Sequence, residues 1–347
     1  MDKYCKFKKY YEEPTHKYNI LTTCVFLMSN SYKQVDNYIN GLKIVANNFE
    51  KVFGHNWYLR VYFDNSILKQ SHPNKEANES TIKYKNIIKD LKSNKFIQLI
   101  KFNCPNFKEK KDDICHFGLF GTIIRFYPLF DFSDNINIDH VIVIDIDIHN
   151  IYKLRSFKKI HDFIISQYPS IKFHGEYRPT VIENVDSRKI KKIWILAGTI
   201  QQYGKKFDNK ILLDFFEKLN SGDNSDIEKY VKSYLSSYNK NYKGIYSYGI
   251  DEYFFNIYIS SKLIDKNKPY SYMYLATTPW LFYAHALFNK EYIDLSIELE
   301  KNIKMMLKYV IEKYYDDSKT LHDNHTILDD MLYQHPEYNF MKKLIFK

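Results

Sequence analysis

Long apolar runs are absent from this chain of 347 residues, and glycine and proline are scarce. No stretch approaches the ~20 apolar residues that a membrane-spanning helix needs, and residues 1–18 are too polar for a secretory signal peptide. With only 10 Gly and 9 Pro, the chain has no Pro/Gly/Ser-rich linker between two domains. We therefore expect a soluble protein without a membrane span, located in the cytoplasm.

Cysteine is also rare and shows no pattern. The four residues, Cys5, Cys24, Cys104 and Cys115, form no C-x-x-C pair and have no histidines at zinc-site spacing. Cysteines without such a pattern are typical of free thiols in a reducing compartment. We therefore expect all of these thiols to be free.

Positive charge exceeds negative charge. Lys and Arg total 51 against 41 Asp and Glu, which gives a net charge of +10 and a pI near 9.0. A basic balance favours polyanionic or phosphorylated partners. The lysines are scattered, however, and the sequence has no long basic arm and no nucleic-acid-binding motif. We expect a small ligand that carries phosphate, and no nucleic acid.

Apolar segments of strand length alternate with segments of helical spacing in the first half of the chain. Strands are expected at 20–28, 57–63, 96–102 and 140–144, and helices at 35–52, within 70–89 and at 118–130. This alternation predicts βαβ units around a mostly parallel sheet, the α/β fold class.

The second half of the chain is less regular. Strands are expected at 171–174 and 193–197, and helices at 211–219, 227–235, 252–260 and 293–315. No internal repeat is present. The pattern predicts one continuous domain over residues 1–290, with a C-terminal helical extension over 291–347 packed on it.

The most informative segment is HVIVIDIDIHN at 140–150, where an apolar strand delivers Asp145 and Asp147 to its carboxyl end. Ligands bind at that edge in open α/β sheets, and residues i and i+2 of an extended segment point to the same side. Mg²⁺ and Mn²⁺ prefer oxygen ligands, commonly one or two carboxylates plus substrate phosphates. The pair therefore predicts a divalent metal site, the alternative being two carboxylates that cap a helix or face solvent.

Three further segments surround the Asp pair in a recognisable order. They are FGTIIRFYPLF at 120–130, WILAGT at 194–199 and YGIDEYFFN at 248–256. Together with the D-x-D strand they resemble the metal-dependent glycosyltransferases of the GT-A type, over residues 20–258. The resemblance implies a Rossmann-like, mostly parallel sheet flanked by helices. Composition and the missing anchor are also similar to those of uncharacterised glycosyltransferases of large DNA viruses, which would imply a host cytoplasm.

The resemblance implies a role for a residue in each motif. Asp145 and Asp147 would hold Mn²⁺ or Mg²⁺ on the donor, with Asp145 also close to its ribose. Arg125 would approach the donor sugar or its diphosphate, unless it forms a surface salt bridge. Gly198 would shape the sugar pocket, since glycine lets a ligand approach the backbone closely.

The acidic motif and the first two strand ends receive roles in the same way. Asp251, or as second choice Glu252, would act as general base on the acceptor hydroxyl, although acidic residues are also favoured at a helix N-terminus. Ser29, Tyr32 and Asp64 would cradle the nucleotide base and ribose. The activity implied is transfer of a sugar from a nucleotide-diphosphate donor, UDP favoured and GDP possible, to a hydroxyl of a glycan, protein or small molecule.

One part of the family pattern is missing. Many relatives that act with retention carry a third metal ligand, a His within H-x-x-G-x-x-K-P-W, and this chain lacks that motif. His149 and His285 are conceivable substitutes. Retention and inversion therefore both stay open.

Two other readings remain. A haloacid-dehalogenase-type phosphatase also places D-x-D after an apolar strand, and GDNSD at 222–226 resembles its later acidic motif. Against it, the strand with the nucleophile normally opens that fold, and here the GD segment follows a helix. The other reading is a catalytically inactive relative that binds a sugar or nucleotide, or has a structural role.

Overall fold

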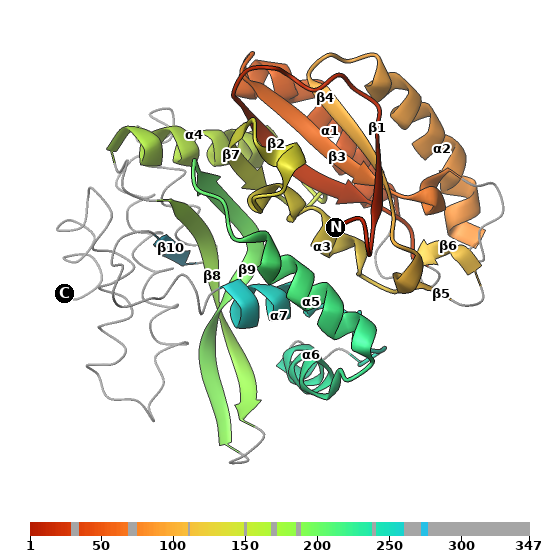
Figure 1. The fold of residues 1–347 in the computed structure, drawn as a ribbon, viewed down its shortest axis with the longest axis vertical. Coiled ribbons are helices and arrows are strands. Elements are labelled where there is room, and N and C mark those ends of the chain that lie inside the picture. Colours follow the sequence, from red (N-terminus) through yellow and green to blue (C-terminus); the bar gives the residue numbers. More distant parts are fainter. Residues whose placement is uncertain are drawn as a thin grey trace, which may run out of the picture.

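Helices cover both faces of one central sheet (Figure 1). The structure is a computed structural model that describes residues 1–28, 35–68, 75–109, 112–148, 151–167, 172–184, 189–237, 241–259 and 272–276. The helix expected at 293–315 and the extension expected at 291–347 lie outside these ranges. The domain boundary at residue 290 therefore stays a prediction.

The central sheet has eight strands in the order β1-β4-β3-β2-β7-β9-β8-β10. Their bounds are β1 Lys6–Lys9, β2 Tyr18–Val25, β3 Trp57–Phe63, β4 Ile97–Asn103, β7 Ile138–Val143, β8 Phe173–Asn184, β9 Lys189–Tyr203 and β10 Tyr272–Ala276. All of them run in the same direction except β1 and β9. The predicted α/β class with a mostly parallel sheet is confirmed for the described residues. Two short strands, β5 Lys108–Glu109 and β6 Asp112–His116, form a separate antiparallel ribbon.

The chain reverses its progress across the sheet between β2 and β7. From β2 it moves outward through β3 and β4, and it then returns to place β7 on the other side of β2. Such a topological switch point opens a crevice at the carboxyl ends of the strands, where ligands bind in open α/β sheets. Val25 and Val143, the last residues of β2 and β7, mark this edge.

The helices form two layers, one on each face of the sheet (Figure 1). The first layer contains α1 Val35–Phe53, α2 Lys75–Lys92 and α4 Ile151–Gln167. The second contains α3 Gly121–Ile124, α5 Asn209–Ser221, α6 Ser225–Ser237 and α7 Ile250–Tyr253, which a π-helix at Phe254–Ile259 continues. Short 3-10 turns are η1 Asn65–Ile67, η2 Pro105–Phe107, η3 Tyr127–Leu129 and η4 Ser133–Asn135.

Successive residues of β7 face alternate layers, as the period of a strand requires. Val141 and Val143 belong to the core beneath the second layer, whereas Ile142 and Ile144 belong to the core beneath the first. The strand is therefore buried on both faces, which explains its continuous apolar sequence.

The single helix expected at 118–130 is wrong. Helix α3 ends at Ile124, Arg125 is its C-cap, and Tyr127–Leu129 forms a 3-10 turn. Pro128 is incompatible with a continued α-helix, because it has no N–H to donate to the Ile124 carbonyl and its ring would clash with that carbonyl. The break leaves Arg125 at a helix end instead of within a long helix surface.

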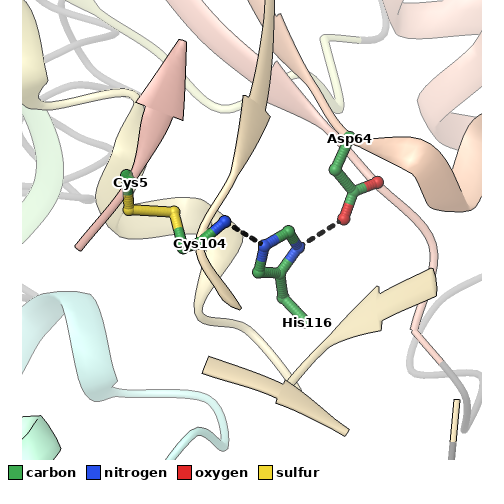
Figure 2. Close-up of a disulfide and its surroundings, with 4 residues drawn as sticks. All are labelled: Cys5, Asp64, Cys104 and His116. Atoms are coloured by element: carbon green, nitrogen blue, oxygen red, sulfur yellow. Dashed lines mark hydrogen bonds and ion pairs between the residues drawn. A yellow bond between two sulfur atoms is a disulfide. The ribbon is translucent and has the colours of Figure 1, made fainter. Parts of the chain in front are cut away.

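The expectation that all four cysteines are free is also wrong. A disulfide joins Cys5 to Cys104 (Figure 2). Cys24 and Cys115 lie outside this disulfide, and both are buried. Strand β1 pairs antiparallel with β4 and aligns Lys6 with Asn103. Cys5 and Cys104 are the next residues beyond this pair, and their Cα atoms lie 4.1 Å apart. The sequence hides this pairing because the two cysteines are 99 residues apart. The cysteines therefore no longer argue for a reducing compartment.

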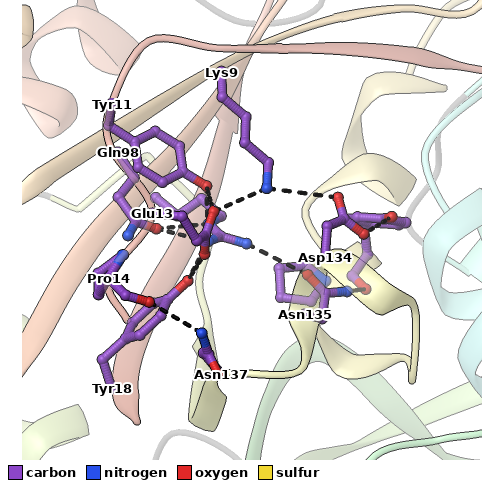
Figure 3. Close-up of polar contacts among 12 residues, drawn as sticks. Lys9, Tyr11, Glu13, Pro14, Tyr18, Gln98, Asp134, Asn135 and Asn137 are labelled. Carbon is purple, nitrogen blue, oxygen red and sulfur yellow. Dashed lines mark hydrogen bonds and ion pairs between the residues drawn. The ribbon is translucent and has the colours of Figure 1, made fainter. Parts of the chain in front are cut away.

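A buried arginine ties the N-terminal segment to the amino ends of the strands. Arg60 of β3 donates from Nη2 to the hydroxyls of Tyr11 and Tyr18 at 3.0 and 2.9 Å, and from Nε and Nη2 to Gln98 Oε1 at 2.9 and 2.7 Å. Its nearest carboxylate in this group, Glu13 Oε1, lies 3.6 Å from Nη2. Figure 3 shows these labelled partners converging from the N-terminal segment and β4.

Candidate functional site

Asp145 and Asp147 lie on a tight turn that follows β7 directly. The turn is closed by a hydrogen bond from the Ile148 N–H to the Ile146 carbonyl, at 2.8 Å. The alternation of β7 continues through it, since Ile146 and Ile148 are buried in the core beneath the first helical layer. The two carboxylates are half-buried, and the same alternation directs them toward the second layer. The turn thus presents both at the switch point of the sheet.

Arg125 bridges this turn to the acidic motif of the second layer. Its guanidinium is 2% exposed, and it donates from Nη1 to Asp145 Oδ1 and from Nη2 to Asp251 Oδ2, the latter at 3.0 Å. The Thr22 hydroxyl of β2 donates to the Arg125 carbonyl at 3.1 Å and fixes the backbone. Charge-assisted pairs of this kind are the strong hydrogen bonds of a protein interior. Arg125 therefore holds two carboxylates from distant segments in one place.

Next to this bridge, Glu252 is a buried acid whose surroundings favour its neutral form. Burial, and then the neighbouring Asp251 carboxylate, raise the pKa of Glu252 well above its usual value of 4.5. Its Oε2 has no hydrogen-bond partner among the described residues. A protonated carboxyl beside a charged one can donate a hydrogen bond and exchange a proton with a ligand. Burial and the adjacent Asp251 therefore favour the protonated form of Glu252 in this site.

Gly198 reaches the same edge of the sheet from β9. The β7–β9 ladder ends with the pair Val143–Ile200 at the carboxyl end of β7, and Gly198 lies on β9 two residues past that pair. Gly198 also lies where the β8–β9 register shifts, between the pairs Gly175–Ile200 and Tyr177–Leu196. Such bulges occur often next to binding sites, and glycine there admits close approach to the backbone.

The structure gives Asp64 other partners. Its side chain is fully buried, Oδ1 accepts from Ser66 N at 3.0 Å, and Oδ2 accepts from Nδ1 of His116 at 2.7 Å. The backbone N–H of Cys104 donates to the other ring nitrogen of His116, at 3.1 Å (Figure 2). In this structure Asp64 thus joins the end of β3 to the segment after β4, and its role toward a nucleotide base stays a prediction. Ser29, Tyr32, His149 and His285 lie outside the described residues.

The donor set fits a metal held jointly by protein and ligand. Two carboxylates on one turn match the one or two protein ligands that Mg²⁺ commonly uses beside substrate phosphates. Within the described ranges, no three or more His, Cys, Asp or Glu side chains gather as a metal site. The residues present therefore fit a metal whose coordination a phosphorylated ligand and water complete, and do not form a closed metal cage.

The acidic loop that suggested a phosphatase has a local role. Gly222 ends α5 in the left-handed conformation, and Asp226 in the first turn of α6 pairs with Lys218 at 2.9 Å and accepts from the Tyr253 hydroxyl at 2.7 Å. These contacts join α5, α6 and α7 within the second layer.

Sequence reasoning missed Gly41 of α1, which contacts the turn of the Asp pair. The signal was available, since a lone glycine inside a helical pattern usually has a packing or functional reason. It also missed Cys5 and Cys104, for which the sequence alone carries no sign of proximity.

Comparisons with models of known protein families and with curated proteins find no match to this chain. Among the helices that the structure describes, none combines the length and the apolar character needed to span a bilayer.

Proposed function

We propose that the protein is a metal-dependent glycosyltransferase of the GT-A type, which moves a sugar from a nucleotide-diphosphate donor to an acceptor hydroxyl. UDP-sugars are the favoured donors and GDP-sugars the second choice. The observation that carries the proposal is the turn at residues 145–148, which sets Asp145 and Asp147 at the switch point between β2 and β7. Diphosphates bound through a divalent metal suit such a pair of carboxylates at that edge.

Two further features support the proposal. Arg125 links Asp145 to Asp251, so the D-x-D strand and the later acidic motif belong to one site. The register of β9 brings Gly198 to the same edge. The ion pairs of Arg125 join three segments that are far apart in the sequence, which supports the proposal of a GT-A type site.

Each residue has a defined task in the proposed reaction. Asp145 and Asp147 would hold Mn²⁺ or Mg²⁺, which when bound stabilises the negative charge that develops on the leaving nucleoside diphosphate. Arg125 keeps Asp145 oriented and its charge balanced. Gly198 leaves room for the donor sugar, and Asp251, next to Glu252, is the candidate for taking the acceptor proton.

The proposal can be tested by the thermal stability of the purified protein with UDP and with GDP, each with and without Mn²⁺. We expect UDP to raise the Tm only when Mn²⁺ is present, because the metal joins the diphosphate to the two carboxylates. Asp147→Asn removes one ligand charge and should abolish the metal-dependent part of the rise. The matched control is Asp90→Asn on α2, an exposed aspartate, which should keep it.

A Tm that no nucleotide changes, with either metal, would contradict the transferase proposal. An Asp147→Asn protein that keeps the full Mn²⁺-dependent rise would show that the nucleotide binds elsewhere. If the nucleotide binds, a panel of nucleotide-sugars assayed for metal-dependent hydrolysis would then identify the donor.

A further inference from the structure

Helix α1 approaches the turn of the Asp pair so closely that only glycine fits at the contact. A Cβ built on Gly41 would lie 1.8 Å from the Ile146 carbonyl oxygen, 2.9 Å from the Ile146 carbonyl carbon and 3.1 Å from the Ile148 nitrogen. Side-chain Cβ atoms essentially never come within 3.0 Å of such neighbours. The obstructing atoms are backbone, so no rotamer change can relieve the clash.

The helix gives no reason of its own for this glycine. Gly41 lies inside α1, which runs from Val35 to Phe53, and glycine in a helix interior costs about 0.5–1 kcal/mol relative to alanine. It has no positive φ, unlike the glycines at positions 54, 118 and 249. Conformational freedom therefore does not explain Gly41, and the close approach to residues 146–148 does.

The contact acts on the part of the turn that sets the direction of the carboxylates. Ile146 separates Asp145 from Asp147, and its carbonyl accepts the hydrogen bond that closes the turn. Ile146 and Ile148 are buried on the side of α1, beneath the first helical layer. A shift of the Ile146 carbonyl away from α1 would therefore rotate the peptide planes that carry both aspartates.

We infer that Gly41 is a positioning residue, which lets α1 hold the turn so that Asp145 and Asp147 present their carboxylates together. The inference rests on the proposed function for its consequence in metal binding, but the effect on the turn is independent of any ligand. A residue that orients metal ligands without touching the metal typically changes metal affinity by about 10- to 100-fold when it is altered.

The experiment compares Gly41→Ala with Asn47→Ala, an exposed position on the same helix. Two quantities are measured for the full-length protein: hydrogen exchange of the peptide that contains residues 141–148, and the Mn²⁺ concentration that half-saturates UDP-dependent stabilisation. We expect Gly41→Ala to speed exchange in that peptide and to raise the half-saturating Mn²⁺ concentration by about 10- to 100-fold. Asn47→Ala should leave both within about twofold of the wild type, the small change usual for a surface substitution.

The possible results separate this inference from the proposed function. If the wild type binds no nucleotide but Gly41→Ala still speeds exchange at 141–148, the positioning of the turn is supported and the transferase proposal fails. If the wild type binds UDP with Mn²⁺ and Gly41→Ala alters neither quantity, the inference is overturned and the proposed function stands. A Gly41→Ala protein that does not fold, beside a folded Asn47→Ala, would also overturn it, because the glycine would then serve the fold as a whole.

Discussion

Two arginines are buried on the same face of the sheet, at opposite ends of its strands and with different kinds of partner. Arg60 lies toward the amino ends, where its nearest hydrogen-bond partners are the neutral groups of Gln98, Tyr11 and Tyr18. Arg125 lies at the carboxyl ends, where both of its ion pairs are with carboxylates, Asp145 and Asp251.

At each end of the strands, a different group needs the hydrogen bonds between arginine and its partners. The tyrosines and the glutamine are uncharged, so at the amino ends it is the guanidinium that needs its partners in order to stay solvated inside the protein. At the carboxyl ends two carboxylates from distant segments would repel each other without Arg125. The first arrangement joins the N-terminal segment to the sheet, whereas the second holds two carboxylates next to each other at the switch point.

Removing Arg125 should have the largest effect. Arg125→Met leaves Asp251 as a buried carboxylate without its guanidinium, and loss of one partner of a buried pair costs about 3–5 kcal/mol. Urea unfolding at pH 7.5 measures this loss, with the Mn²⁺-dependent effect of UDP recorded beside it. A loss under about 1 kcal/mol would show that the two ion pairs of Arg125 contribute little to the fold.

Removing Arg60 should cost less and should leave the proposed site intact. Arg60→Met leaves the Gln98 carbonyl and two tyrosine hydroxyls without their hydrogen-bond donor. We expect this to lower the free energy of unfolding by about 1–3 kcal/mol. Glu13, whose side chain is 32% exposed, can turn to water. We expect a destabilisation that is nearly equal at pH 5 and 7.5, and an unchanged dependence of UDP stabilisation on Mn²⁺. A weakened metal response in a folded Arg60→Met protein would remove the distinction between the two arginines.

Local patterns in the sequence predicted much of the fold. The strand expected at 57–63 is β3, Trp57–Phe63, and the helix expected at 35–52 is α1, Val35–Phe53. The first is a mostly apolar run of strand length, and the second carries the 3.6-residue period of an amphipathic helix. Such segments depend little on the rest of the chain, so the sequence suffices to identify them.

Contacts between distant segments could not be predicted in this way. Arg125 was assigned to the donor, whereas its described contacts are with Asp145 and Asp251, 20 and 126 residues away along the chain. The Cys5–Cys104 disulfide has the same origin, an antiparallel edge strand whose register no local pattern encodes. The direction of the Asp pair was accessible, because alternation along β7 continues into the turn. The close contact of α1 with that turn, at Gly41, could not be predicted from the sequence.

The smallest expected effect concerns two glutamates, one near each arginine, whose pH dependence should have opposite signs. At Glu252, burial and Asp251 raise the pKa, so the stability it contributes is complete below the unfolded value of 4.5 and is lost as the pH rises through the higher folded value. At Glu13, burial opposes ionisation, but hydrogen bonds from Lys9 and Tyr18 lower the pKa overall. Its contribution is therefore present above 4.5 and is lost as the pH falls.

Replacement by glutamine, which stays neutral, separates the two cases. Glu252→Gln should match the wild type near pH 4.5 and exceed its stability at pH 7.5, because the wild-type carboxyl loses its stabilising contribution as the pH rises. Glu13→Gln should instead be less stable than the wild type at pH 7.5, by under about 1 kcal/mol because the group is partly exposed, and should match it at low pH. Urea unfolding from pH 4.5 to 7.5 decides the matter. If both variants change the stability at pH 7.5 in the same direction, the two glutamates respond to pH in the same way. The surroundings of the two arginines would then differ in geometry and not in electrostatics.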